Sequence, residues 1–428
     1  MPHAIELNIM NNIPTIKLTP KGARRFESAH PWIYKSDLVS PLPSEAGVVR
    51  VEDPRKRFLA QAIYSPASQI ALRILSRGAE LINQEWFAKR IQSAIALRKR
   101  LAIPSDAVRL FFGESDGIPA FIVDQFADVI SFQTLCAGID RYKDWLVDIL
   151  WEELKPAAIV ERNDVPVRAI EKLPMIAKVH QLSLLCKEGS GEVDHELPLP
   201  TSPYKGEEYR KLTAGKTIIN EGELKFAVDV LHGQKTGAYL DQRDNRFLAA
   251  TFASGSVLDC FSYEGWFAVH MAKNANSILC IDSSEAALAK VCENAKLNGL
   301  ESKIKTKEAN GFDFLKEEDA RGAHYDCINL DPPPFVRSAR DRASGFRGYK
   351  EINLRAMKLL RPKGILITSS CSHHFSDEDF DAMIADAAKD AKVTAQVLYR
   401  HGAAPDHPIL VGFPESHYLK YRIINITV

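Results

Sequence analysis

The sequence predicts an α/β protein in which a domain built on a mostly parallel sheet follows two smaller domains. From about residue 215 onward, strand-like runs alternate with helical stretches, and this alternation gives a parallel sheet with helices on both faces. Residues 1 to about 78 contain short apolar runs interrupted by turn residues, which is typical of a β-rich module. With 428 residues, the chain is long enough for two or three domains that each bury a core.

The N-terminal module is predicted from the runs TIKL, GVVRVE, FLAQAIY and IALRIL. Residues 1–78 carry eleven lysines and arginines against six acidic residues, a net charge of +5, while the formal charge of the whole chain is zero. This asymmetry indicates an anionic partner such as nucleic acid, with a well-solvated surface as the alternative, and charge alone does not decide between them.

The middle of the chain, to about residue 190, is predicted to be a small α/β domain. Residues 83–101 have helical periodicity, with Phe87, Ile91, Ala94 and Leu97 on one stripe. The run RLFFGESDGIPAFIVDQF reads as two strands joined by a turn at Ser115-Asp116-Gly117. Residues 187–208 are polar and rich in proline and glycine, and we interpret them as a linker or a surface insertion.

The C-terminal region is predicted from its strands and their connections. One helix is expected over 284–298, with Ser283 or Ser284 as N-cap, Gly299 as the stop, and Leu288, Val291, Cys292 and Ala295 on its apolar stripe. Four strands are expected at 256–261, 277–282, 326–331 and 364–371, and a last one in YLKYRIINITV. In such sheets, ligands bind at the carboxyl ends of the strands.

Composition excludes several classes of protein. No apolar run approaches the roughly 18 residues of a membrane span, and the N-terminus lacks the pattern of a secretory signal. The seven cysteines are odd in number and widely spaced without a CxxC, which argues against a disulfide framework and a zinc site. We therefore expect a cytoplasmic protein with no metal, in which most thiols are small core residues.

Polar groups follow each predicted strand. Asp259 and Asp282 end the first two strands, and an acid at the second position can bind both ribose hydroxyls of a nucleoside. The first turn, DCFSYEG, lacks the closely spaced glycines that let a pyrophosphate sit on a helix N-terminus. A cofactor with ribose and adenine but no phosphate, S-adenosylmethionine, therefore fits better than NAD. Taken singly, either acid could equally be a helix cap.

The third and fourth strands end in reactive residues. Asp331 opens DPPPF, a rigid platform on which a flat base could lie, with Asp331 on its amine edge. Phe335 could stack on that base or be a buried aromatic at the turn. Cys371 at the end of the fourth strand could attack a pyrimidine carbon, or be a core cysteine, and its position favours attack. His373 and His374 follow it, and a metal pair is set aside because neighbouring strand residues face opposite ways.

Two further segments could contact ligands. Residues 336–350 interleave five basic residues with two aromatic ones, which favours contacts with RNA over a merely solvated loop. Residues 233–246 are dense in polar groups and could cover the cofactor, with Arg243 holding its carboxylate, or could form a capped, charged surface helix.

Nearly the whole chain resembles the ribosomal RNA large subunit methyltransferase I family of 5-methylcytosine enzymes. HPWIYKSDL and AIYSPASQIALRIL resemble its PUA-type RNA-binding domain, and GESDGIPAFIVDQF and ERNDVPVRAIE its central domain. The motifs of its methyltransferase domain are matched by GQKTGAYLDQRDNR, DCFSYEGWFAVH, LDPPPF, GYKEIN, SSCSHHF and DHPILVGFPESHYLK.

The resemblance implies a fold and a set of domains. It implies a PUA-like β-barrel over 1–80, a central α/β domain over 81–190, and a Rossmann-like class I methyltransferase domain with a seven-stranded sheet over 191–428. It also implies S-adenosylmethionine as cofactor and 23S ribosomal RNA as partner, with no membrane, and it leaves a homodimer open.

The resemblance implies a chemistry in which Cys371 adds to C6 of a cytosine, C5 takes the methyl group, and loss of the C5 proton with expulsion of the thiol restores the ring. Asp331 would hold the cytosine edge. Cofactor contacts are expected from Tyr239, Gln242, Arg243, Asp259, Phe261, Tyr263, Gly265, Asp282, Ser283, Asn310 and Asp331, and substrate contacts from Pro332, Phe335, Arg337, Arg340, Arg342 and Arg347.

This sequence departs from the family at two positions that bear on the site. Pro334 stands where a larger side chain such as lysine is usual, and this difference alters the contacts expected with the base. Asn310 stands where an aspartate is common, which weakens the expected adenine contact. The family lacks the second cysteine by which related enzymes release their product, so the release step uses another group.

Three other functions compete with this interpretation. Methylation of an exocyclic amine would use the acid and prolines of DPPPF but no thiol. An RNA-binding assembly factor with a vestigial pocket is disfavoured by the intact Asp259, Gly265 and Asp282. An NAD oxidoreductase is disfavoured by the missing glycine fingerprint.

Overall fold

The computed structural model describes residues 13–182 and 215–427, and these fall into two compact units. Unit 1 comprises Met1–Ile219, Val228–Tyr239 and Asp406–Ser416, and unit 2 comprises Asn220–Ala227, Leu240–Pro405 and His417–Val428. The expected linker at 187–208 and the N-terminal segment 1–12 lie outside the described residues. No helix in the described ranges is long and apolar enough to cross a membrane.

The first part of unit 1 is a five-stranded sheet with the order β1-β3-β4-β5-β2. In β3, side chains alternate between buried and half-buried, the period of two that places one face on a core. That core contains Leu18, Val51 and Leu72. The predicted β-rich module is therefore confirmed. Its elements are β1 (Thr15–Lys17), α2 (Pro20–Glu27), β2 (Trp32–Ile33), η1 (Lys35–Asp37), β3 (Gly47–Glu52), β4 (Phe58–Tyr64) and β5 (Leu72–Ser76).

The second part of unit 1 is a five-stranded sheet with the order β10-β9-β8-β7-β6, and helix α3 packs on its core through Phe87 and Ile91. Asn83 caps α3 by accepting a hydrogen bond from the Trp86 amide, as expected for a helix starting there. The elements are α3 (Gln84–Arg100), β6 (Ala107–Phe112), η2 (Gly113–Asp116), β7 (Phe121–Phe126), β8 (Val129–Thr134), α4 (Ala137–Asp140), α5 (Lys143–Leu154), β9 (Ala158–Asn163), α6 (Val167–Ile170) and β10 (Ile176–Leu182).

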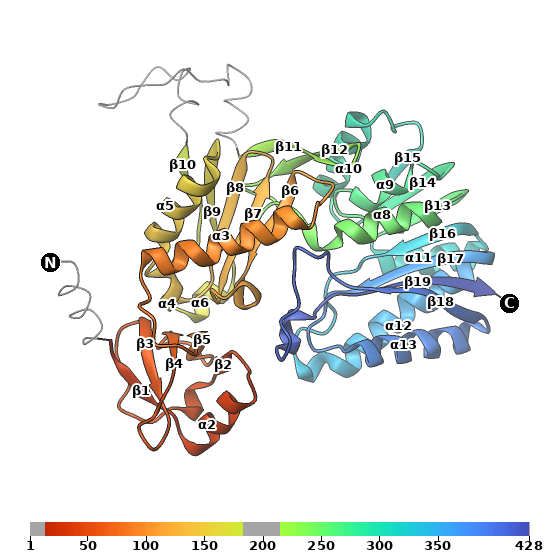
Figure 1. Cartoon of the computed structure of the whole chain (residues 1–428). Coiled ribbons are helices and arrows are strands. Elements are labelled where there is room, and N and C mark those ends of the chain that lie inside the picture. The colour runs from red at the N-terminus through yellow and green to blue at the C-terminus, as the bar shows by residue number, and fades with distance from the viewer. Residues whose placement is uncertain (1–12, 183–214, 428) are drawn as a thin grey trace, which may run out of the picture. The chain divides into compact units, whose positions relative to one another are not determined.

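Unit 2 contains the predicted parallel sheet, with seven strands in the order β15-β14-β13-β16-β17-β19-β18 (Figure 1). The five strands from β15 to β17 are parallel, and β19 runs antiparallel to both of its neighbours, β17 and the edge strand β18. The strand order reverses at β13, the switch point where such sheets bind ligands. The strands are β13 (Ser256–Cys260), β14 (Ser277–Asp282), β15 (Ile304–Glu308), β16 (Tyr325–Leu330), β17 (Leu360–Ser370), β18 (Thr394–His401) and β19 (Lys420–Thr427).

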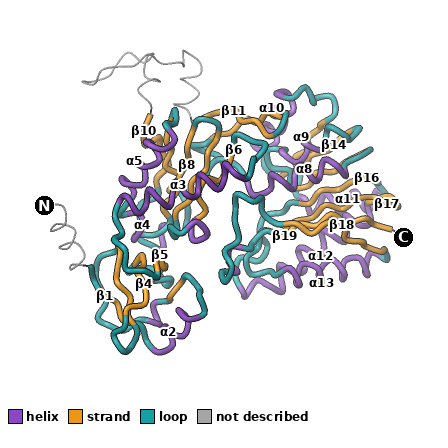
Figure 2. Tube along the Cα trace, viewed as in Figure 1, coloured by secondary structure: helices purple, strands orange, loops and turns teal. Residues whose placement is uncertain are grey.

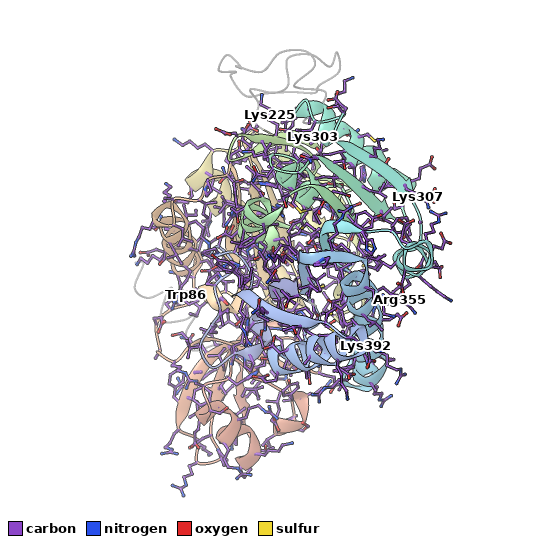
Figure 3. All side chains as sticks on the ribbon, turned by 90° about the vertical axis from the view of Figure 1, so that its right-hand side faces the viewer. Trp86, Lys225, Lys303, Lys307, Arg355 and Lys392 are labelled. Atoms are coloured by element: carbon purple, nitrogen blue, oxygen red, sulfur yellow. The ribbon has the colours of Figure 1, made fainter. Side chains whose placement is uncertain are left out.

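Helices cover both faces of this sheet, as the purple segments beside the orange strands show in Figure 2. Helices α8, α9 and α10 pack against one another, and α11, α12 and α13 form a second group. Figure 3 labels Arg355 of α12 and Lys392 at the C-cap of α13. The helices are α8 (Arg243–Phe252), α9 (Trp266–Met271), α10 (Glu285–Leu297), α11 (Gly311–Arg321), α12 (Arg342–Leu359) and α13 (Asp377–Ala391), with η4 (Leu240–Gln242), η5 (Ala339–Asp341) and η6 (Pro414–Ser416).

In helix α10, the predicted N-cap and the predicted C-terminal glycine are confirmed, but one residue of the predicted apolar face is not buried. Ser284 accepts a hydrogen bond from the Ala287 amide, and Gly299 follows the helix with φ of 66°. Leu288 and Val291 are buried, whereas Cys292 is exposed. One helical residue turns by about 100°, so the side chain after Val291 faces away from the sheet.

A buried ionic cluster joins α8 and α9 to the hairpin of β11 (Lys216–Glu221) and β12 (Leu224–Asp229). Glu221 accepts two hydrogen bonds from the Arg246 guanidinium at 2.6 and 2.7 Å, and His270 Nε2 lies 2.9 Å from Glu221 Oε1. Burial alone would raise the pKa of Glu221, but attraction to Arg246 and the His270 contact outweigh it and hold that pKa at about 2. The cluster therefore keeps a carboxylate charged inside the unit.

Substitution Glu221→Gln is expected to lower the free energy of unfolding by about 3–5 kcal/mol at pH 7, because it leaves Arg246 buried without its counter-charge. Since the folded pKa of Glu221 is depressed, this stabilisation is present above the unfolded value of about 4.3 and is lost as pH falls through about 2. Urea unfolding at pH 7 and at pH 3 measures both effects.

The matched control is Glu223→Gln, because Glu223 pairs with Lys273 at 3.2 Å on the surface and should change the unfolding free energy by less than about 1 kcal/mol. Equal unfolding midpoints for the two variants at pH 7 would contradict a stabilising role of the cluster.

Candidate active site

Four neighbouring parallel strands bring the predicted acids and the predicted cysteine to one edge of the sheet. Asp259 is the penultimate residue of β13, and Asp282 is the last residue of β14. Asp331 and Cys371 come directly after the last residues of β16 and β17. Because these strands are adjacent and parallel, their carboxyl ends lie along the same edge.

The turn after β13 has an unusual backbone. Phe261, Tyr263 and Gly265 all have positive φ, at 66°, 48° and 74°, a conformation that phenylalanine and tyrosine rarely adopt. A Cβ on Gly265 would lie 2.8 Å from Val291 Cγ1, so this position also requires the absence of a side chain. Strained backbone of this kind is concentrated at ligand sites. The turn is therefore shaped for a ligand at the carboxyl edge.

The second acid, Asp282, fixes this turn. Its Oδ2 accepts a hydrogen bond from the Tyr263 amide at 2.9 Å, and its Oδ1 accepts one from the Ser284 amide at 3.0 Å. A carboxylate has about four acceptor positions, so these two bonds leave room for the ribose hydroxyls expected from the sequence. Asp282 therefore serves as a local cap while it remains available to a nucleoside.

Asp259 is buried. Its Oδ1 accepts a hydrogen bond from Asn329 Nδ2 at 2.8 Å, and the Ala268 amide in the first turn of α9 also interacts with the carboxylate. Burial raises the pKa of Asp259 to about 7, Asn329 opposes that rise, and the charges of Asp331 and Asp282 add to it.

These residues fit S-adenosylmethionine, which would supply an electrophilic methyl group. The cofactor carries a positive sulfonium and an ammonium group, and three carboxylates stand along this edge. Asp259 would provide a buried carboxylate acceptor, and Asp282 would bind the ribose.

The affinity for S-adenosylmethionine is expected to fall as pH drops from 8 to 6. Asp259 has a raised pKa of about 7, so its carboxylate is present above that pH and becomes protonated below it. A cationic ligand binds the ionised form better, so the loss approaches about tenfold per pH unit below 7. Calorimetric Kd values at pH 6, 7 and 8 measure it. The Asp259→Asn variant should bind weakly at every pH, and a wild-type Kd independent of pH would contradict this role.

Asn310 and Ser283, also expected at the cofactor, are both exposed in the structure. The Asn310 side chain caps α11 by accepting hydrogen bonds from the Phe312 and Asp313 amides at 2.9 and 3.4 Å. An asparagine can make this cap as well as the usual aspartate, which explains why the position tolerates the change.

Asp331 is held in a fixed plane by two donors. Its Oδ1 accepts hydrogen bonds from Gln242 Nε2 at 3.0 Å and from the Ser369 hydroxyl at 2.5 Å. Gln242 is in turn fixed by Asn245, whose Nδ2 donates to Gln242 Oε1 at 2.6 Å. The expected Gln242 is thus linked to the expected Asp331, and Ser369 and Asn245 were not anticipated from the sequence.

The prolines after Asp331 lead into packed aromatic residues. Phe335 is half-buried, with its ring 4.6 Å from that of Tyr349 and 5.4 Å from that of Phe312. It therefore acts as packing under the platform, one of the two roles that the sequence left open. Pro332 is buried and Pro333 is exposed, so the segment turns outward right after Asp331.

Cys371 differs from the other described cysteines. Cys136, Cys260, Cys280 and Cys327 are fully buried, and burial raises the pKa of each thiol, which makes them unreactive. Cys371 is half-buried at the carboxyl edge. His373 and His374 lie in the turn that follows and not in the strand, and both are exposed. Most thiols are therefore core residues, as predicted, and Cys371 is the exception at the site.

The Cys371 turn is tied to the platform through Ser372. Ser372 Oγ accepts a hydrogen bond from the Val336 amide at 3.1 Å and lies 2.9 Å from the Tyr349 hydroxyl. The Tyr349 hydroxyl also accepts from the Phe335 amide at 3.4 Å. These bonds fix the segment that carries the thiol against the segment that follows Asp331.

The basic segment after the platform is only partly available to a ligand. Arg342 pairs with Asp379, and Lys350 lies between Asp386 and Asp390 at 2.7 and 2.6 Å. The other three basic residues are exposed, and none has an ion pair within the described part of the chain: Arg337, Arg340 and Arg347. Arg342, which we expected to contact RNA, is instead paired with Asp379 of α13.

The segment 233–246 is divided between the units. Tyr239 ends a segment of unit 1, and Lys235 Nζ lies 4.4 Å from the centroid of its ring. Arg243 lies in unit 2 at the start of α8, fully buried, and its Nε donates to Asp244 at 3.2 Å.

Comparisons with known proteins agree with this geometry. The sequence models of two families match: one described as an S-adenosylmethionine-dependent methyltransferase over residues 209–411, and one described as a PUA-like domain over residues 16–77. A curated relative from Shewanella denitrificans, ribosomal RNA large subunit methyltransferase I, is 39% identical over 420 residues, covering 96% of this chain and 99% of the relative. The protein of that name from Shewanella amazonensis is 38% identical over 419 residues with equal coverage.

A solved structure from Streptococcus mutans, described as a putative SAM-dependent methyltransferase, shares the fold with a TM-score of 0.76 at 20% identity. The match covers 96% of this chain and 100% of that chain.

Proposed function

This chain belongs to the ribosomal RNA large subunit methyltransferase I family of S-adenosylmethionine-dependent enzymes, and from this we propose that it methylates C5 of a cytosine in 23S ribosomal RNA. The observation that carries the proposal is Cys371, a half-buried thiol at the carboxyl edge beside the fixed carboxylate of Asp331. Methylation at an unactivated ring carbon needs a nucleophile that raises electron density at C5, and a cysteine thiolate supplies it.

In the proposed reaction, the Cys371 sulfur forms a bond to C6, and the ring electrons move to C5. Asp331 accepts a hydrogen bond from the N4 amine of the cytosine and so holds the base in the plane that Gln242 and Ser369 set. After methyl transfer, C5 loses its proton to a base, and the C–S bond breaks with return of its electron pair to Cys371. The thiolate is then regenerated and the aromatic ring restored.

The RNA substrate is supported by two features in different parts of the chain. The PUA-like match covers the basic N-terminal module, where exposed Lys21, Arg55 and Arg57 add to its positive charge. Arg337, Arg340 and Arg347 lie on the segment that follows the platform. Cations on this segment suit phosphate contacts beside the base. We assign residues 1–80 to RNA binding, 81–190 to a central domain and 191–428 to methyl transfer, in the cytoplasm where thiols stay reduced.

Nucleoside mass spectrometry with bisulfite mapping of 23S ribosomal RNA tests the proposal in cells with and without the gene. We expect one 5-methylcytosine to disappear with the gene and to return on complementation. An unchanged 5-methylcytosine pattern together with the loss of another methylated nucleoside would overturn it.

Methylation of an exocyclic amine is the second candidate, and the acid-proline segment at Asp331 favours it. RNA that contains 5-fluorocytidine separates the two reactions, because fluorine at C5 blocks loss of the proton and traps the enzyme on C6. A covalent complex that forms with S-adenosylmethionine supports C5 chemistry, and its absence supports the amine.

A further inference from the structure

Lys420 is a buried lysine that brackets the Cys371 turn. It opens β19, where it pairs with Ser370 in the antiparallel register with β17. Its Nζ donates hydrogen bonds to the carbonyl oxygens of Ser372 and Tyr418, both at 2.7 Å. The side chain is 2% exposed. Lys420 therefore contacts the residues on both sides of Cys371. It donates to the carbonyl of Ser372, and it is the strand partner of Ser370.

Both hydrogen bonds of Lys420 are donated to main-chain carbonyl oxygens, and they fix the position of Nζ beside the turn. Burial lowers the pKa of Lys420 to about 8, while the charges of Asp377 and Cys371 raise it against this effect. At neutral pH, Lys420 is thus still mostly protonated, although it lies in the interior.

The interaction between Lys420 and Cys371 works in both directions. A thiolate that favours the ammonium form of Lys420 is itself favoured by that ammonium to the same extent. The other titratable groups around the turn are Tyr349 of α12, Asp377 and Asp379 of α13, Arg422 of β19, Asp331, and His373 and His374 of the turn itself. Arg422 is paired with Asp377 and Asp381, so its charge is largely compensated. Lys420 is then the cation that the turn carbonyl holds in place.

We propose that Lys420 is a positioning residue that keeps Cys371 in its thiolate form and holds the turn in which the thiol sits. The proposal rests on the assignment of Cys371 as the nucleophile. It requires only an electrostatic effect, since Lys420 forms no bond to the base and transfers no proton in the step.

The test measures the thiol directly, without methyl transfer. The full chain is alkylated with iodoacetamide between pH 5 and 10, and the rate is followed in the tryptic peptide 364–389, which contains Cys371 and no other cysteine. In the wild type, the pH at which the alkylation rate of Cys371 reaches half its maximum should lie clearly below the pKa of a free thiol, roughly 8.5. Lys420→Gln keeps a donor for the Ser372 carbonyl but removes the charge, and should raise the midpoint by about 1 unit or more.

The matched control is Lys303→Gln. Lys303 Nζ also donates to a main-chain carbonyl, that of Ala272 at 2.8 Å, but it precedes β15 at the amino end of the sheet (Figure 3). Lys303→Gln should leave the alkylation midpoint of Cys371 unchanged. For Lys420→Gln, the methylation rate at pH 7 should fall about tenfold and recover toward the wild-type rate at pH 9, which a loss of folding would not do.

Three results would overturn the proposal: a wild-type midpoint at or above about 8.5, an unchanged midpoint in Lys420→Gln, or an equal shift in Lys303→Gln. The first result is measured on the wild type alone, so it tests the proposal even if Lys420→Gln folds poorly. Failure of the cytosine assignment is separate, because it shows as no trapping by 5-fluorocytidine RNA while the alkylation midpoint still depends on Lys420.

Discussion

Substitution Cys371→Ala is expected to abolish methyl transfer, with a loss of at least about 10⁴-fold, while the Kd for S-adenosylmethionine stays within about twofold. The reason is that C5 of a cytosine gains enough electron density to accept a methyl group only after a nucleophile has added to C6. Cys371 is half-buried, so loss of its sulfur removes little packing and the fold should persist. Single-turnover methylation of 23S ribosomal RNA and calorimetry measure the two quantities.

The control for this variant is Cys292→Ala, because Cys292 is the exposed cysteine on α10, away from the strand ends. It should methylate at the wild-type rate. Normal methylation by Cys371→Ala would exclude the covalent mechanism, and with it the reason to assign cytosine C5.

Substitution Asp331→Asn is expected to lower kcat/KM by about 100-fold or more, with most of the loss in kcat. The amide would keep the shape and one acceptor oxygen, but it would replace the charged acceptor that binds the N4 amine with a weaker neutral one. Gln242 and Ser369 donate to Oδ1 in the present geometry, so an asparagine could retain those bonds and the local fold. Steady-state methylation across RNA concentrations separates kcat from KM.

The matched control is Asp326→Asn, in the same strand β16 but near its amino end, where Asp326 accepts from the Ser256 amide and pairs with Arg361. It should leave kcat unchanged. Equal kcat values for Asp331→Asn and the wild type would show that Asp331 does not act on the base.

The sequence predicted the five inner strands of the unit 2 sheet, because each inner parallel strand is a continuous apolar run that ends in a polar residue. It missed the edge strands β15 and β18, whose side chains are mostly exposed and polar or mixed in sequence. The run at 277–282 became β14 with the same bounds, and the helix expected over 284–298 became α10 over 285–297. The convergence of Asp259, Asp282, Asp331 and Cys371 follows from that topology alone.

The residues that the sequence did not reveal act through contacts between distant segments. Lys420 and Ser369 become parts of the site only because β19 pairs with β17 and β17 lies next to β16. Arg342 looked available in the sequence, but Asp379 of α13, 37 positions further along, pairs with it. Asn329 looked like an ordinary strand residue, yet it donates to Asp259, its register partner on the neighbouring strand β13. The pattern of neighbouring residues in the sequence does not predict such contacts between distant segments.

The six segments that make up the two units mean that the chain passes from one unit to the other five times. Neither unit is therefore encoded by one uninterrupted stretch of the gene. A recombinant fragment that starts at residue 220 would contain 406–416 without the unit in which that segment packs, and a fragment that stops at 219 would lack it. Exchange of one unit between relatives would thus need several coordinated junctions.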